Sequence, residues 1–111
     1  MALVPQIKAT GIEITDSIRE YVEKKVAMLE KHYQHIIGIN AEVDVTTHHH
    51  NKGMIYRAEL NVVVPGKLLR VEKTADDLYK AIDKAKEHMA LMLKGYKEKK
   101  IDKVRRTRVR E

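Results

Sequence analysis

The spacing of the apolar residues changes twice along this 111-residue chain, and the two changes restrict the folds that it can adopt. Between Ile18 and Tyr33 apolar residues recur three or four positions apart, which is the spacing of one face of an α-helix. In two stretches between Ile39 and Val64 they recur at every second position, as in strands with one buried face. The helical spacing returns at Leu78. The pattern therefore predicts two amphipathic helices that flank a run of strands.

Capping residues indicate the ends of the first helix. Thr15 is a suitable N-cap, and Asp16 follows in the first turn, where the helix dipole favours an acid. The helix should end at about residues 32–35, before Gly38. The apolar stripes predicted to face the core are Ile18, Val22, Val26, Leu29 and Tyr33 on the first helix, and Leu78, Ala81, Ile82, Ala85, Met89, Leu93 and Tyr96 on the second.

Turn and cap residues divide the rest of the chain. The segment THHHNKG at residues 47–53 is expected to form a hairpin loop, and PGK at Pro65–Lys67 a tight turn into a third strand. Thr74 is expected to cap the second helix, with Asp77 three residues on as a shortened capping box. This helix should end near Gly95 or a few residues beyond.

These elements favour one arrangement of layers. With a short extended run after Pro5, the order is β-α-β-β-β-α. Each helix has one apolar stripe and the sheet has one apolar face, so the economical packing places both helices on one face of a four-stranded sheet. We therefore predict a two-layer α+β sandwich. The other face would be solvated, and acids outnumber cations on it: Glu42, Asp44, Glu59 and Glu72 against Lys8, Arg57 and Arg70.

The composition excludes several classes of protein. There is no Cys, so the chain has no disulfide, no thiolate nucleophile and no Cys-ligated zinc. No apolar run approaches the roughly 20 residues that span a membrane. The N-terminal residues lack the basic and long apolar parts of a signal peptide. We expect a soluble cytoplasmic protein with one domain, no membrane contact and no cofactor.

No set of residues typical of a catalytic site stands out. Ser17 is the only serine and falls in the first turn of a helix, and the glycines are isolated, so no phosphate-binding loop is present. The run His48–His50 suggests a metal site, but neighbouring strand residues point to opposite faces and no acid or cysteine lies close by in sequence. We predict neither an enzyme nor a native metal site. An acid-binding or metal-binding protein centred on these histidines is kept as an alternative hypothesis.

The excess positive charge lies at the C-terminal end. The chain has 22 Lys or Arg and 16 Asp or Glu, and Lys94–Glu111 holds nine basic and three acidic residues, so residues 1–93 have no net charge. Four arginines lie within residues 105–110, and their planar guanidinium groups suit phosphate. We predict a folded domain at residues 1–97 and a basic tail at residues 98–111 that is disordered when free and has a polyanionic partner. A solubilising or membrane-surface segment is the alternative for the tail.

Cations on the two predicted helices extend the basic set. They lie opposite the apolar stripes or on their flanks, although interleaved acids are also typical of a solvated helix face. The candidate RNA-binding residues are Arg19, Lys24, Lys25, Lys31, Lys80, Lys84, Lys86, Lys94, Lys97, Lys99, Lys100, Lys103, Arg105, Arg106, Arg108 and Arg110.

Two stretches resemble the ribosome hibernation-promoting factors, a family also described as ribosome-associated inhibitor A or sigma-54 modulation proteins. In GIEITDSIREYVEKKVAMLEKH the family has an I-T-x-x-I-R helix start and ends on L-E-K. In KTADDLYKAIDKAKEHM the family reads D-[LM]-Y-x-A-I-D, and VPGKLLRVEK fits the strand turn of some members. The resemblance covers about residues 5–100.

The resemblance implies a non-enzymatic protein that binds the small ribosomal subunit and contacts 16S rRNA with its basic helix faces. It implies occupation of the channel of mRNA and of the A- and P-site tRNAs, so that the protein competes with tRNA and mRNA and blocks translation by occlusion. The chain stops before the dimerising domain of the long family members. It therefore resembles a short form, expected to be a monomer when free.

The match to the family is uneven along the helices. Three residues of the first helix match basic family positions: Arg19, Lys25 and Lys31. At four positions the chain lacks a basic residue that is common in the family: Met28, His88, Leu91 and Gly95. Other cations are expected to compensate: Lys80, Lys84, Lys94 and those of the tail. The alternative function is that of a general double-stranded-RNA or nucleic-acid-binding module.

Overall fold

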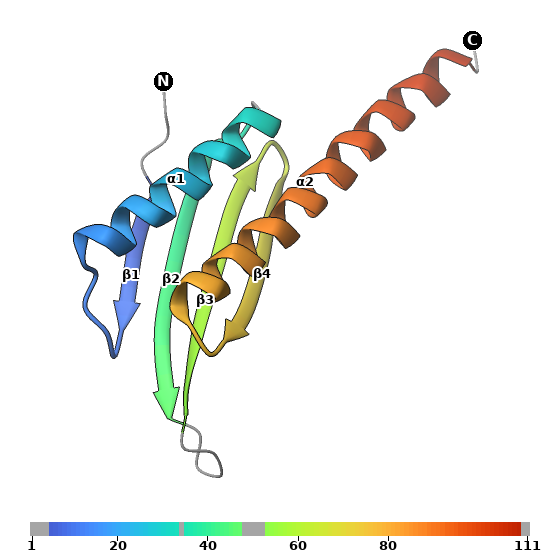
Figure 1. The fold of residues 1–111 in the computed structure, drawn as a ribbon. Coiled ribbons are helices and arrows are strands. Elements are labelled where there is room, and N and C mark those ends of the chain that lie inside the picture. Colours follow the sequence, from blue (N-terminus) through green and yellow to red (C-terminus); the bar gives the residue numbers. More distant parts are fainter. Residues whose placement is uncertain (1–4, 34, 48–52, 110–111) are drawn as a thin grey trace.

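The computed structural model describes residues 5–33, 35–47 and 53–109, with residues 47 and 99–109 described by their backbone alone. Its elements are β1 (Gln6–Thr10), α1 (Asp16–His32), β2 (Gly38–Thr47), β3 (Met54–Val64), β4 (Lys67–Ala75) and α2 (Leu78–Val109). The strands form one sheet in the order β1-β2-β3-β4. β1 is parallel to β2, and the other neighbours are antiparallel. Both helices cover the same face of this sheet (Figure 1), so the predicted two-layer α+β fold is confirmed.

The first helix begins and ends where its capping residues predict. The backbone N–H of Ile18 donates to Oγ1 of Thr15 at 3.2 Å, and the N–H of Arg19 donates to the carbonyl of Thr15 at 3.0 Å. At the other end the N–H of Tyr33 donates to the carbonyl of Leu29 at 3.0 Å. These bonds satisfy backbone groups that a helix leaves open at its ends.

The start of the second helix differs from the prediction. Thr74 belongs to β4 and pairs with Arg57 of β3. Oδ1 of Asp77 instead accepts the N–H groups of Tyr79 at 2.7 Å and Lys80 at 3.4 Å, so Asp77 is the cap. The prediction that Thr74 caps this helix is wrong, because β3 is long enough for β4 to stay paired through Ala75.

The end of the second helix also differs. The end expected near Gly95 is wrong, because α2 continues without a break to Val109. Glycine costs a helix only about 1 kcal/mol relative to alanine, and the residues that follow Gly95 include many Lys, Glu and Arg, which favour helix. The backbone is thus helical through most of residues 98–111, which were predicted to form a tail that is disordered when free. The division into a domain of residues 1–97 and a functional tail of residues 98–111 stays a prediction.

The core lies between the two layers and follows the predicted periodicity. All the predicted stripe residues of both helices are buried except Tyr96, which is partly buried and packs against the core. The sheet contributes Ile39, Ala41, Val43, Ala58, Leu60, Val62, Val64, Leu69 and Val71. The predicted turn after Val64 is present, with Gly66 at φ +80°, a conformation that favours glycine. The expected hairpin loop falls largely on residues 48–52, outside the described residues.

Candidate nucleic-acid interface

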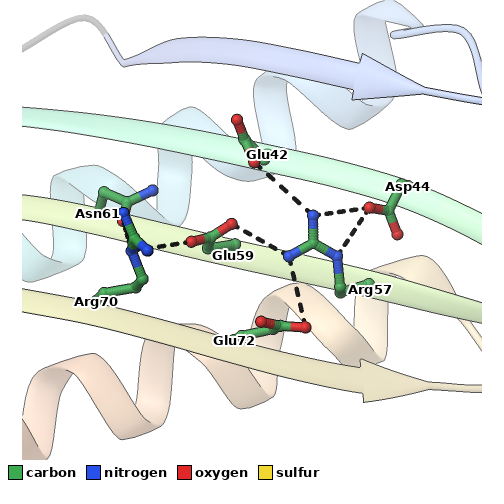
Figure 2. A network of polar contacts seen from close by, with 7 residues as sticks. All are labelled: Glu42, Asp44, Arg57, Glu59, Asn61, Arg70 and Glu72. Atoms are coloured by element: carbon green, nitrogen blue, oxygen red, sulfur yellow. Dashed lines mark hydrogen bonds and ion pairs between the residues drawn. The ribbon is translucent and has the colours of Figure 1, made fainter.

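The solvent-facing side of the sheet is organised around Arg57 of β3 (Figure 2). Its Nη2 lies 2.7 Å from Oδ2 of Asp44, and its Nε donates to the same oxygen at 2.8 Å. Its Nη1 lies 3.1 Å from Oε2 of Glu59 and 3.5 Å from Oε1 of Glu72. Glu42 is 3.7 Å away from Nη2. One guanidinium therefore contacts carboxylates from three neighbouring strands.

Strand register explains why this arginine is needed. Glu42, Glu59 and Glu72 lie directly opposite one another on β2, β3 and β4, where like charges repel. Arg70 also contacts Glu59, with Nε 3.1 Å from Oε1. The hydrogen bond with Asp44, and after it that with Glu59, raises the pKa of Arg57 above its ordinary value despite partial burial. The guanidinium therefore stays charged and holds the glutamate row together.

Both arginines of this face are thus bound to carboxylates. Arg70 donates in addition to Oδ1 of Asn61 at 2.8 Å, and Lys8 lies opposite Glu42 in the register of β1 with β2. A phosphate that approached this face would be repelled by the acids, and it would meet arginines whose donors already contact carboxylates. The open sheet face is therefore a poor surface for RNA.

The helical layer has a different charge distribution. α1 contains equal numbers of basic and acidic residues, whereas α2 contains 11 Lys or Arg and four Asp or Glu over Leu78–Val109. The candidate residues whose side chains are exposed are Arg19, Lys24, Lys31, Lys80, Lys84, Lys94 and Lys97, and those that are partly buried are Lys25 and Lys86. Lys99, Lys100, Lys103, Arg105, Arg106 and Arg108 lie on the backbone of α2, and Arg110 lies outside the described residues.

Two of these cations form ion pairs, and only one of the pairs joins different elements. Lys80 pairs with Asp76 at 3.4 Å, four residues earlier on the exposed surface. Nζ of Lys25 on α1 lies 3.1 Å from Oδ1 of Asp83 on α2. Lys84 donates to the backbone carbonyl of Thr74 at 3.4 Å. Among the candidates whose side chains the structure describes, the rest form no ion pair with another described side chain: Arg19, Lys24, Lys31, Lys84, Lys86, Lys94 and Lys97.

Lys25 belongs to a cluster that ties the two helices together. The hydroxyl of Tyr21 donates to Oδ1 of Asp83 at 2.6 Å, and Nζ of Lys25 lies 5.0 Å from the centre of the Tyr21 ring. The Tyr79 ring meets that of Tyr21 edge to face at 4.8 Å. The hydrogen bond with Asp83 raises the pKa values of Tyr21 and Lys25. Burial alone would raise the pKa of Asp83, but the hydrogen bonds from Tyr21 and Lys25 lower it below its ordinary value.

The sequence did not reveal this role of Lys25. Its partner Asp83 is 58 positions away and belongs to another helix, so no local spacing connects the two. In the structure the ammonium group of Lys25 pairs with an acid between the helices, and this acid compensates much of its positive charge. The candidate therefore contributes less free positive charge than Arg19, Lys24 or Lys31.

Three candidates surround one groove on the helical layer. This groove, with a volume of about 490 Å³, runs between the end of α1 and the middle of α2. It is lined by His32, Lys86, Glu87, Ala90, Leu91, Leu93, Lys94 and Lys97. A second hollow of about 410 Å³ is lined by Lys73, Lys84, Glu87, His88 and Leu91. Four cations of α2 therefore line two hollows that share Glu87 and Leu91: Lys84, Lys86, Lys94 and Lys97.

Lys73 was not among the candidates, although the sequence contains the signal for it. It lies on β4, opposite Ala58 and two residues after the buried Val71. The alternation that buries Leu69 and Val71 directs Lys73 to the helical side of the sheet. Its cation joins those of α2 at the second hollow.

Two negative findings apply to the described residues. None of them forms a group of three or more His, Cys, Asp and Glu side chains that would hold a metal ion. The run His48–His50 lies outside these residues. Among the described helices, none is both long and apolar enough to cross a membrane.

Comparison with known proteins gives consistent matches. Residues 6–101 match the profile of the family described as sigma 54 modulation protein / S30EA ribosomal protein. The chain is 32% identical over 92 residues to a ribosome hibernation promotion factor of Deinococcus radiodurans, covering 83% of this chain and 48% of that protein. It is 33% identical over 108 residues to one of Picosynechococcus sp., covering 95% and 53%. The chain thus spans about half the length of these relatives.

Two solved structures have the same fold. One is the N-terminal domain of Protein Y of Thermus thermophilus, with a TM-score of 0.66 and 38% identity over 86% of this chain and 99% of that one. The other is a ribosomal subunit interface protein of Coxiella burnetii, with a TM-score of 0.73 and 26% identity over 85% and 97%.

Proposed function

The chain belongs to the sigma 54 modulation protein / S30EA ribosomal protein family, and from this premise we propose that it binds the small ribosomal subunit in the channel of mRNA and tRNA and blocks translation by occlusion. The relatives are named for ribosome hibernation and for the interface between ribosomal subunits. The partner proposed for this chain is 16S rRNA, and the function needs no catalytic step.

The difference in charge between the two layers supports this proposal most directly. Arg57 and Arg70 on the sheet face are held by carboxylates. On the helical layer, Lys86, Lys94 and Lys97 have no ion-pair partner among the described side chains. Ribosomal RNA presents a dense field of phosphates, and it is recognised largely by shape and by backbone contacts. The helical layer is therefore proposed as the RNA-facing side, with the sheet turned away.

The mechanism follows from position and size. The sheet supports both helices through one continuous core, so the helical layer is presented as a rigid surface. Bound in the decoding channel, this body would fill space that mRNA and tRNA need. The basic segment of residues 98–111 is proposed to extend the contact with RNA and to speed association by electrostatic attraction.

Sedimentation with purified 30S subunits tests the proposal. The chain is expected to co-migrate with 30S at low salt and to dissociate as salt rises. The slope of log K against log salt should be about −0.7 for each phosphate contacted. Absence of co-migration at low salt would contradict the proposal.

A pair of charge variants tests which layer faces the RNA. Lys94→Gln removes an exposed cation of the helical layer, and Lys8→Gln removes one at the sheet face. We expect the first variant to weaken binding and to make the salt slope shallower by about 0.7, and the second to bind as the unchanged protein does. The opposite result would place the RNA on the sheet face.

Competition separates a ribosome factor from a general nucleic-acid-binding module. A ribosome factor should be displaced from 30S by tRNA and mRNA, and a large excess of naked duplex RNA should displace it poorly. A general module should bind 30S subunits and naked duplex RNA with similar affinity. Equal competition by 30S and duplex RNA would therefore favour the alternative function.

A further inference from the structure

The side chain of Leu91 is unusually exposed for its type and position. It is 68% exposed on α2, the highest value among the large hydrophobic side chains in the described part of the chain. It lies in the middle of the long helix and not in a loop, and it lines both hollows of the helical layer. An apolar side chain in this place contributes nothing to the core between helices and sheet.

Cations lie on both sides of this leucine. One hollow has Lys86, Lys94 and Lys97 with His32, and the other has Lys73 and Lys84 with His88. Among the described residues, Glu87 is the only acid that lines these hollows, and it lines both of them. The surface therefore has cations on both sides of a centre that consists of the apolar Leu91 and the acid Glu87.

A single strand of RNA has a matching arrangement of charged and apolar groups. Its phosphates repeat along the backbone, and an unpaired base offers a flat apolar surface between two of them. We propose that an unpaired stretch of RNA crosses α2 at Leu91, with one base on the Leu91 side chain and the flanking phosphates in the two hollows. The larger hollow, at about 490 Å³, lies in the size range of sites for small organic ligands.

This inference rests on the proposed function in naming RNA as the ligand, and it adds that Leu91 holds an unpaired base. A duplex would not provide such a contact, because its bases are stacked and paired within the helix. The competing occupant of a basic surface with an apolar centre is an acidic peptide that contains one apolar side chain. Charge alone fits both ligands, so the test contains an arm for each.

The experiment compares two labelled oligoribonucleotides of seven residues, one of uridines throughout and one with an abasic site at the centre. Both carry the same phosphates, so a difference in affinity measures the base alone. Stacking of one base on an aromatic side chain strengthens binding by roughly 5- to 150-fold. For an aliphatic contact we expect the full chain to prefer the complete oligomer by about three- to tenfold, and Leu91→Ser to lose this preference.

Matched variants keep the result interpretable. Leu68 is 52% exposed on β4, away from both hollows, so Leu68→Ser should keep the preference of the unchanged protein. Leu91→Met should also keep it, because the side chain stays apolar. Lys94→Gln should weaken both oligomers equally, because it removes a phosphate contact. Circular dichroism verifies that each variant is folded.

The outcomes separate this inference from the proposed function. If the chain binds 30S but does not distinguish the two oligomers, or if Leu91→Ser distinguishes them as before, the inference is wrong and the ribosomal proposal stands. If Leu91→Ser weakens binding of the acidic peptide Glu-Glu-Leu-Glu-Glu and of no oligomer, the site is one for protein. Failure of the chain to bind 30S at low salt overturns the ribosomal proposal, whatever the oligomers do.

Discussion

At Arg57 the sequence places a cation where three glutamates would otherwise face one another across neighbouring strands. Its side chain is 24% exposed, and it contacts Asp44 and the glutamate row at once. Removing one partner of a buried ion pair leaves the other charge without compensation, which costs more than the pair itself contributes. Arg57 therefore matters to the fold, and its donors already contact carboxylates.

We expect Arg57→Met to lower the free energy of unfolding by about 2 kcal/mol, less than the 3–5 kcal/mol of a fully buried pair because the acids are partly hydrated. Urea unfolding at pH 7 measures this. Arg70→Met is the control: its side chain is 66% exposed and has one carboxylate partner, so the loss should stay below about 1 kcal/mol. Adding Glu59→Gln to Arg57→Met should restore part of the stability. Equal losses in the two single variants would show that Arg57 has no special role in the sheet.

The Asp83 carboxylate links the helices in a way that depends on pH. Its pKa is lower in the folded protein than the ordinary value of 3.8. The folded state therefore favours the ionised form, and this contribution to stability is full above pH 3.8 and is lost as pH falls through the folded pKa. The hydrogen bonds donated by Tyr21 and Lys25 are the cause.

Asp83→Asn should lower the free energy of unfolding at pH 7 by about 0.5–1 kcal/mol, since the carboxylate is 40% exposed and water screens its interactions. The difference from the unchanged protein should shrink when the urea unfolding is repeated at pH 3. Asp76→Asn removes an exposed carboxylate with only a surface partner and should change little at either pH. A difference for Asp83→Asn that grew on acidification would refute the assigned role.

At the scale of elements, the start of α2 illustrates how strand pairing overrides the local sequence signal for a helix cap. Thr74 is a good cap by its chemistry, but β4 uses its backbone in the sheet. Asp77 then becomes the nearest side chain that reaches the free N–H groups of the helix. Local spacing of cap residues could not decide between the two, because the length of β4 depends on its partner β3.

The effect of removing each side chain distinguishes the two caps. Asp77→Ala should lower the free energy of unfolding by about 1 kcal/mol, because two N–H groups lose their acceptor. Thr74→Ala should cost less than about 0.5 kcal/mol, because no capping bond involves its side chain in the described residues. Thermal and urea unfolding of both variants provide the measurement, and a larger loss for Thr74→Ala would restore the sequence-based assignment.

Gly95 tests whether α2 is continuous. A Cβ added at this position meets nothing within 4 Å, and the residue is helical. Gly95→Ala should therefore raise the free energy of unfolding by about 0.5–1 kcal/mol and increase the helical signal in circular dichroism. Gly66→Ala is the contrast: Gly66 has φ +80°, so alanine should destabilise the turn between β3 and β4 by about 1 kcal/mol. Destabilisation by Gly95→Ala would indicate that the helix ends there.

For the molecule as a whole, periodicity was enough to predict the layers. The stripe from Ile18 to Tyr33 and the alternation around Leu60 became the buried faces that they predicted. The sequence did not reveal the Lys25–Asp83 pair or the two hollows, because these depend on how the helices pack against each other. The alternation along β4 was sufficient to predict that Lys73 lies on the helical side of the sheet, although Lys73 was not among the candidates.

Net positive charge is concentrated at the C-terminal end of the chain as well as on the helical layer. The described core extends no further than Tyr96, whose hydroxyl donates to the carbonyl of Pro65 at 2.5 Å. Residues beyond it add charge, and the charge is positive. If the segment acts on RNA, binding and stability should respond separately to its removal.

Deletion of residues 101–111 separates the two. The deletion removes Lys103, Arg105, Arg106, Arg108 and Arg110 and should weaken binding to 30S, with a salt slope shallower by about 0.7 for each phosphate that the shortened chain no longer binds. The midpoint of thermal unfolding should change by less than about 3 °C, because the deletion leaves every described core residue in place. A full-length variant with these five cations replaced by glutamine should bind as weakly as the deletion if charge is the cause. If the deletion variant and the unchanged protein bind 30S with equal affinity, residues 101–111 do not contribute to RNA binding. The helical layer would then bind the RNA by itself, and these residues would act only as a solubilising segment.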